Sequence, residues 1–249
     1  NVSFTALSLA LGGNFVSPSF AEPNPERNAY FGETHIHTSW SVDAWVMGNR
    51  ITGPADAYKY AQGQTIKHPM GYDIKIETPM DFMGVTDHSE YVGVTKQANT
   101  PGSYVSKLPE AQPLIMNDPN SKEEQNRVFS YLLKLGAGAP VKAFMNPKIT
   151  ESVWAEACKI ADEANQPGKF TAFHSYEWTS MPGNRNLHRN VFFRGEKVPS
   201  APFSSLDSTA PTELWKWMDT QRKAGIELLA ISHNGNVSDG WMYPMDIDN

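Results

Sequence analysis

Five apolar segments rich in β-branched residues, separated by helical patterns, constrain the fold of this chain more than any other feature. They predict strands over residues 29–37, 81–86, 170–177, 188–194 and 226–232. Helices are predicted over residues 121–135, 150–165 and 211–224, with a weaker one over 54–62. Strands that alternate with helices predict an α/β fold with a mostly parallel sheet, either open or closed into a barrel.

The rest of the chain is interpreted as segments that connect these elements rather than as a second domain. Residues 97–120 carry prolines at 101, 109, 113 and 119, so a long surface excursion is expected there. With 249 residues and 40% hydrophobic content, the chain is long enough for one α/β domain with a sizeable core, although two smaller domains are the alternative. We take residues 22–249 as one domain.

Charge and cysteine content narrow the classes of function. The net charge is -6 and the basic residues are scattered, which argues against a nucleic-acid partner. The only cysteine, Cys158, lies in a helical pattern and is interpreted as a buried structural thiol. One cysteine permits neither an intrachain disulfide nor a thiolate cluster, so any metal must bind to histidine and carboxylate ligands.

The first 21 residues resemble a secretory signal peptide. An apolar run is followed by small and polar residues and ends in Ser19-Phe20-Ala21, which leaves Glu22 as the mature start. We therefore expect a periplasmic or secreted bacterial protein. No segment is long enough and apolar enough to span a bilayer. The chain lacks an initiator Met, and its last residues complete neither a helix nor a strand. We therefore interpret it as a fragment at both ends.

The strongest local signal is Gly32-Glu33-Thr34-His35-Ile36-His37-Thr38. Residues two apart on a strand point to the same face, so His35 and His37 can reach one metal ion. The alternative is two solvated or hydrogen-bonded histidines on an edge strand.

Two further predicted strands end in histidine, in Thr86-Asp87-His88 and Ser232-His233-Asn234. In parallel α/β folds the carboxyl ends of the strands face one common mouth, where sites are built. Glu177 ends a third strand and His188 begins the next, so an antiparallel hairpin would bring these two residues to the same end. His35, His37, His88, Glu177, His188 and His233 together predict a metal site. His174, out of phase with Glu177, and His68, in a loop, are interpreted as structural.

These motifs together resemble the PHP superfamily, named for polymerase and histidinol phosphatase domains, in a secreted bacterial branch labelled a domain of unknown function. The resemblance runs from about Tyr30 to Tyr243 and is carried by the segments 32–38, 86–88, 176–178, 187–190 and 232–236. It implies a distorted (β/α)7 barrel with two or three divalent ions at its carboxyl mouth, commonly zinc, manganese or iron.

The resemblance also implies roles for the ligands. His35 and His37 match ligands of a first ion, Glu177 the bridging carboxylate, and His188 with His233 ligands of a second ion. His88 matches the residue that serves a third ion. The family pattern ends in an Asp-x-His motif that does not occur after His233, which is expected if the chain is truncated before its last strands and its site is incomplete.

The leading functional hypothesis is hydrolysis of a phosphate or sulfate ester by a hydroxide that bridges the metals. Arg185 and Arg189 flank His188 and are candidates to bind an anionic small-molecule or carbohydrate substrate; surface solubility is the alternative. Asp87, Glu90 and Asp43 are candidates to orient the ligand histidines, and Asp87 also to carry protons.

Three alternatives stay open at this stage. The first is an amidohydrolase-type reaction on an amide or lactone. The second is a non-catalytic metal-containing module that binds carbohydrate through the aromatic regions 40–45 or 215–217. The third is a purely structural secreted domain, which predicts no bound metal.

Overall fold

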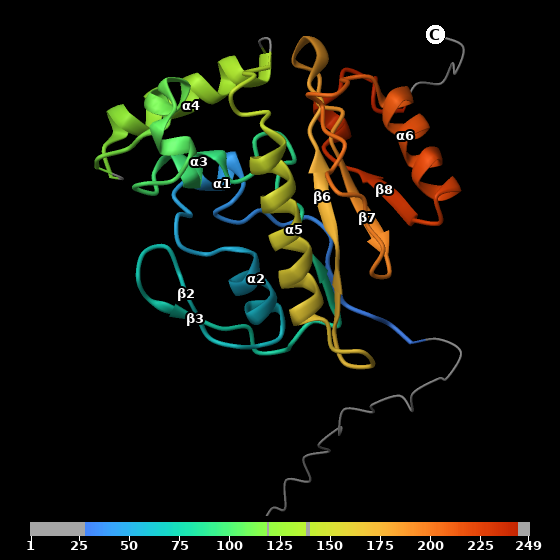
Figure 1. The fold of residues 1–249 in the computed structure, drawn as a ribbon. Coiled ribbons are helices and arrows are strands. Elements are labelled where there is room, and N and C mark those ends of the chain that lie inside the picture. The colour runs from blue at the N-terminus through green and yellow to red at the C-terminus, as the bar shows by residue number, and fades with distance from the viewer. Residues whose placement is uncertain (1–27, 119, 138–139, 244–249) are drawn as a thin grey trace, which may run out of the picture.

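A computed structural model describes residues 28–118, 120–137 and 140–243, and shows a mixed α/β fold (Figure 1). The predicted signal peptide, residues 1–21, lies outside the described residues. Within the described ranges, every helix is too short or too polar to cross a membrane.

In the part of the chain that the structure describes, eight strands form three small sheets. The first sheet is parallel and has the order β1 (Gly32–Glu33), β4 (Phe82–Gly84), β5 (Thr171–Phe173). The second is antiparallel and has the order β6 (Ser175–Trp178), β7 (Arg189–Arg194), β8 (Glu227–Ser232). The third is a hairpin of β2 (Ile66–Lys67) and β3 (Asp73–Ile74).

Helices surround these sheets. The α-helices are α1 (Val42–Val46), α2 (Pro54–Ala61), α3 (Val94–Ala98), α4 (Lys122–Ala137), α5 (Pro147–Ala164) and α6 (Pro211–Lys223). Four short 3-10 helices complete the described chain: η1 (Val105–Lys107), η2 (Pro109–Leu114), η3 (Pro182–Asn184) and η4 (Gly235–Val237). All four predicted helices are confirmed. The second begins at Pro147 because Asn146 caps it, accepting a hydrogen bond from the Lys148 amide at 3.0 Å.

The α/β class is confirmed, but among the described residues no sheet closes into a barrel, and only one of the two larger sheets is parallel. The predicted strand over 170–177 breaks at His174 into β5 and β6. β5 pairs with β4, whereas β6 pairs with β7 in a hairpin. The Ser175 hydroxyl donates to the Val85 carbonyl at 2.8 Å, and the Glu177 amide donates to the Asp87 carbonyl at 3.0 Å. These hydrogen bonds join the two sheets.

The two faces of the second sheet have different surroundings. Tyr176 and Val191 form a cross-strand pair that packs against the helices α5 and α6 in one apolar core. On the opposite face, Phe192 pairs with Leu229, which is 52% exposed. Phe192 reaches across to β4, where a Cβ on Gly84 would lie only 2.3 Å from its ring. Glycine at 84 therefore permits this close packing of the two sheets.

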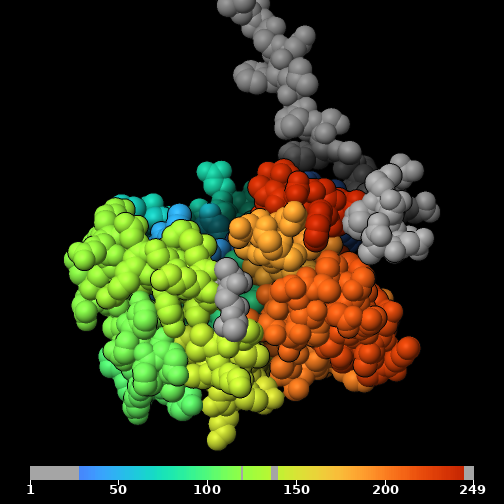
Figure 2. Space-filling view, turned by 90° about the horizontal axis from the view of Figure 1, so that it is seen from above, coloured from blue at the N-terminus to red at the C-terminus, as the bar shows by residue number. Residues whose placement is uncertain are grey.

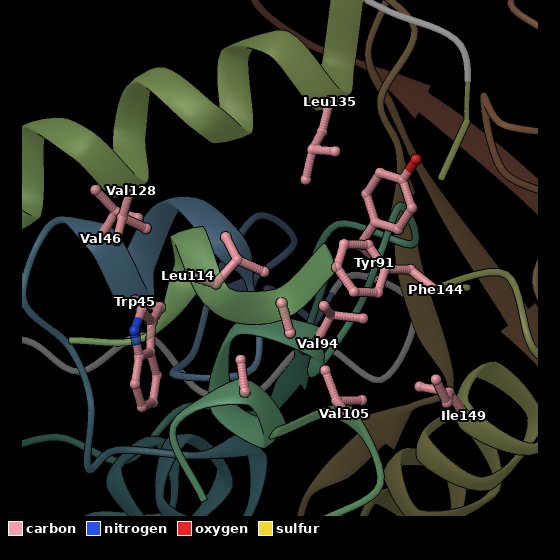
Figure 3. Close-up of a cluster of buried hydrophobic side chains, with 12 residues drawn as sticks. Trp45, Val46, Tyr91, Val94, Val105, Leu114, Val128, Leu135, Phe144 and Ile149 are labelled. Atoms are coloured by element: carbon pink, nitrogen blue, oxygen red, sulfur yellow. The ribbon is translucent and has the colours of Figure 1, made fainter. Parts of the chain in front are cut away.

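A second core lies among α1, α3, η1, η2 and α4 (Figure 3). The prediction of a surface excursion over 97–120 is wrong, because Val105, Ala111 and Leu114 are fully buried in this core. Proline fixes the short 3-10 turns without preventing them from presenting apolar side chains inward. In the view from above, the green region that contains α3 and α4 and the orange region that contains α6 lie on opposite sides of the molecule (Figure 2).

Candidate metal centre

Glu177, on β6, is the centre of the site, and its side chain is 0% exposed. Burial alone raises the pKa of this carboxyl, but the adjacent His88 and the hydrogen bonds from other histidines outweigh burial and hold the pKa well below its usual range. A fully buried carboxylate that stays ionised requires several positive or polar partners.

Five histidines supply those partners. Oxygen Oε2 of Glu177 lies 3.2 Å from His35 Nε2, 2.9 Å from His37 Nε2 and 3.2 Å from His233 Nε2. Oxygen Oε1 lies 3.3 Å from His88 Nδ1 and 2.8 Å from His188 Nδ1. The structure therefore brings together all six residues that the sequence suggested as metal ligands.

Backbone contacts explain how the first two histidines converge. Only Gly32–Glu33 of the predicted strand 29–37 is assigned as strand, yet Ile36 is held in place by Thr86 at the end of β4. The Ile36 amide donates to Thr86 Oγ1 at 3.0 Å, and the Thr86 amide donates to the Ile36 carbonyl at 2.9 Å. His35 and His37 flank this anchored residue and both reach Glu177.

The hairpin brings in the remaining ligands. β6 and β7 are antiparallel, as expected, with Glu177 opposite Asn190, so His188 lies two residues further along on the same face. Asn190 donates from Nδ2 to the Thr34 carbonyl at 2.8 Å, which ties β7 to the segment that carries His35. His233 follows β8, and its amide lies 3.3 Å from the His188 carbonyl.

Asp43, in the first turn of α1, is the residue whose role the sequence understated. Its Oδ2 lies 2.7 Å from His37 Nδ1 and 3.4 Å from His88 Nε2. The contact with His37 fits the predicted orienting role. Asp43 also forms one of two three-residue groups whose possible ligand atoms lie within 4.8 Å of one another: His37, Asp43 and His88, and His35, Glu177 and His233.

The donor set fits divalent metal ions. Nε2 of His188 and both ring nitrogens of His233 are buried without a hydrogen-bond partner among the described residues, although His233 Nε2 is near Glu177. Buried nitrogens without partners are costly unless they bind something. Imidazole and carboxylate donors suit zinc, iron or manganese. The grouping differs from the implied one, since His35 lies with His233 rather than with His37, and His188 belongs to neither three-residue group.

Asp87 and Glu90 accept hydrogen bonds from the segments next to the site. Asp87 is buried, which raises the pKa of its carboxyl to about 6 although hydrogen bonds from Thr38 oppose the shift. It accepts from the Thr38 amide at 2.5 Å and the Thr38 hydroxyl at 2.7 Å, and so anchors the chain directly after His37. Glu90 Oε1 accepts from the amides of Thr179 and Ser205, at 3.2 and 2.6 Å. The hydrogen bonds that these two acids accept therefore come from backbone amides and from the Thr38 hydroxyl rather than from histidine rings.

The two arginines do not join the cluster. Arg189 lies on the opposite face of β7 from His188, and its guanidinium carbon is 5.8 Å from the Trp178 ring centroid and 5.0 Å from that of Trp215. Arg185 pairs with Asp239 at 3.1 Å. Side-chain alternation along β7 accounts for Arg189, because adjacent residues of a strand face opposite ways.

The other two histidines are structural, as predicted. His174 is buried, and its Nε2 lies 2.8 Å from Asp162 Oδ1 on α5. His68 stacks on Tyr72 in the β2–β3 hairpin, with ring centroids 4.3 Å apart.

Comparison with known proteins places the chain in a family. The profile of a family described as "Protein of unknown function (DUF3604)" matches residues 24–249. No curated protein and no solved structure matches the chain.

Proposed function

We propose that this chain, which belongs to the DUF3604 family, is a metal-dependent hydrolase of phosphate or sulfate esters. One observation carries the proposal: a fully buried carboxylate, Glu177, is contacted by five histidine nitrogens. Structural cores rarely bury so many titratable groups together, whereas hydrolytic metal centres require them. The resemblance of these motifs to the PHP superfamily supports the same conclusion, and we propose that the protein is exported.

Two groups of side chains would hold the ions. His35, Glu177 and His233 form one, and His37, Asp43 and His88 form the other, with Glu177 in contact with both. His188 adds a further imidazole beside Glu177. Ions bound there would polarise an ester oxygen and make a water molecule acidic enough to supply a nucleophile near neutral pH.

The surrounding residues of the chain hold this arrangement rigid. Asp43 accepts from His37 and fixes the orientation of its ring. Asp87 holds Thr38 and thereby the loop that follows His37, so we assign it a positioning role; its predicted role as a proton carrier stays a prediction. Preorganised ligands reduce the reorganisation needed during reaction.

A second candidate, hydrolysis of an amide or lactone, is favoured by the placement of the arginines. Arg185 binds Asp239, and the guanidinium group of Arg189 lies against two tryptophan rings. Neither group faces the histidines. An uncharged substrate needs no guanidinium. The binding-module alternative is weakened for the region 40–45, where Trp40 and Trp45 are 6% and 7% exposed, but not for the region 215–217, where Trp215 is 39% exposed.

Metal analysis and a substrate panel test the proposal. The protein is loaded separately with zinc, manganese and iron(II), its bound metal is counted, and hydrolysis is measured on an aryl phosphate, an aryl sulfate, an aryl amide and a lactone. We expect stoichiometric metal and turnover of the phosphate or the sulfate. Turnover of only the amide or lactone would favour the second candidate.

A matched pair of variants separates the site from general effects. His35→Ala removes a contact of Glu177, whereas His68→Ala removes a half-buried hairpin histidine far from the cluster in sequence and stacked on Tyr72. Metal content is expected to fall only in His35→Ala. The proposal is abandoned if both variants retain the wild-type metal content and the loaded protein hydrolyses none of the four substrates.

A further inference from the structure

Thr179 lies at the metal centre although no motif pointed to it. It follows β6, two residues after Glu177, and its hydroxyl lies between Glu177 and His88. We propose that Thr179 is a positioning residue that dictates which ring nitrogen of His88 is available to bind an ion. This inference rests on the proposed metal centre and assigns a residue that acts through His88.

The direction of the hydrogen bonds follows from the number of protons. A threonine hydroxyl has one proton to donate. The oxygens of Glu177 lie among five imidazole nitrogens and act as acceptors, so the hydroxyl of Thr179 donates to Glu177 Oε1 at 3.1 Å. The remaining contact, between Thr179 Oγ1 and His88 Nδ1, then requires that Nδ1 carries the proton and donates it.

This assignment leaves the other nitrogen of His88 for coordination. Nε2 lies 3.4 Å from Asp43 Oδ2, inside the group of His37, Asp43 and His88. A metal ligand is a neutral imidazole nitrogen, and the hydrogen bond made by its partner nitrogen determines which one is free. Thr179 therefore directs His88 Nε2 towards Asp43 and away from Glu177.

Without the hydroxyl, the site has a competing arrangement. His88 Nδ1 is only 3.3 Å from Glu177 Oε1, so the ring can bond the carboxylate directly. That bond would draw the His88 ring towards Glu177 and shift Nε2 from its position beside Asp43. By accepting from His88 and donating to Glu177, the Thr179 hydroxyl fixes the positions of these two side chains relative to each other.

The backbone fixes Thr179 in this position. Its amide donates to Glu90 Oε1 at 3.2 Å, and the same oxygen accepts from the Ser205 amide at 2.6 Å. Glu90 follows His88 by two residues, so the loops on both sides of the hydroxyl are tied together. Threonine also has restricted rotation about χ1, which limits the positions its hydroxyl adopts.

Substitution at 179 tests the inference with zinc alone as the probe. Thr179→Val removes the hydroxyl and keeps the shape, whereas Thr179→Ser keeps the hydroxyl. Loss of such a supporting contact weakens metal affinity by about 10–100-fold. We expect a loss of that size for Thr179→Val, measured by competition with a chelator, and affinity within about threefold of wild type for Thr179→Ser.

The matched control is Thr95→Val. Thr95 is a buried threonine on α3, and its hydroxyl has no partner among the described residues. This variant is expected to bind zinc like wild type. Thermal unfolding of all variants shows whether any loss of affinity accompanies loss of fold, and Thr179→Ser decides the matter if Thr179→Val is unstable.

Nitrogen-15 NMR of histidine in the zinc-loaded protein provides a second readout. The inference predicts a proton on His88 Nδ1 and zinc on Nε2 in the wild type and in Thr179→Ser. It is overturned if zinc occupies Nδ1, or if Thr179→Val binds zinc with unchanged affinity. A wild-type protein that binds no zinc, manganese or iron would instead refute the proposed function itself, so the two failures are distinguishable.

Discussion

Metal binding at this site should release protons, and the contacts of His37 give the magnitude. Burial alone lowers the pKa of His37, but hydrogen bonds to Asp43 and Glu177 outweigh it and raise the pKa to about 9 in the metal-free protein. At pH 7 a group with that pKa is roughly 99% protonated. An ion that binds His37 must displace this proton, which by itself raises the apparent affinity about tenfold per pH unit from 7 to 9. The pKa of His88, in the same group, is also raised well above its usual value, so its proton adds to this dependence.

Stability of the metal-free protein should change in the opposite direction. The pKa of His37 is raised by folding from 6.5 to about 9, so its contribution to the free energy of unfolding is fully present below pH 6.5 and is lost as pH rises through 9. Zinc titrations at several pH values, in buffers of different ionisation enthalpy, count the released protons calorimetrically. Asp43→Asn should lower the pKa of His37 and move the upper end of its pH dependence to lower pH. An affinity that is constant from pH 7 to 9, with no proton release, would refute the reasoning.

Three further outcomes follow from packing. Gly32→Ala should destabilise the protein by about 1–3 kcal/mol, because a Cβ there would lie 2.2 Å from the Phe82 carbonyl oxygen. The control Gly235→Ala should be tolerated, because the nearest atom to its Cβ would be 3.6 Å away. Urea unfolding compares the stability of the two variants. Burial raises the pKa of Cys158 to about 12, so a thiol reagent at pH 8 should label it only after unfolding, and rapid labelling of the native protein would contradict its burial. Phe193→Ala should cost about 3–5 kcal/mol of unfolding free energy, since this ring is 1% exposed, and a loss below 1 kcal/mol would show that the core has collapsed around it.

Local pattern was sufficient to locate most elements but not to arrange them. Each predicted strand contains an observed strand, because runs of β-branched and apolar residues are typical of buried strands. The break at His174 depends on which neighbour each half of the segment pairs with, whereas the antiparallel hairpin after Glu177 was predicted. Residues 97–120 were misjudged for a similar reason, because a proline-rich segment shows no periodicity even where Val105 and Leu114 are core residues.

The site was predictable where its ligands follow strands and not elsewhere. His88 and His233 follow the strands β4 and β8, and that position alone implies convergence at one edge of an α/β sheet. Asp43 lies in a helix turn and was predicted only to orient a histidine, whereas Thr179 lies in a loop and nothing in its local sequence distinguishes it from ordinary polar residues. Arg189 was assigned to the site by its proximity in sequence to His188, although strand alternation sends its side chain to the other face.

The supporting hydrogen bonds of the centre are made by protein groups alone. Thr86 holds Ile36, Asp87 holds Thr38, and Asn190 holds Thr34, so the segment that carries the first two histidines is fixed without an ion. The raised pKa of His37 and the lowered pKa of Glu177 pair a protonated imidazole with an ionised carboxylate. An ion that takes the place of the imidazole proton is expected to release it, so the number of protons released is a direct measure of metal occupancy.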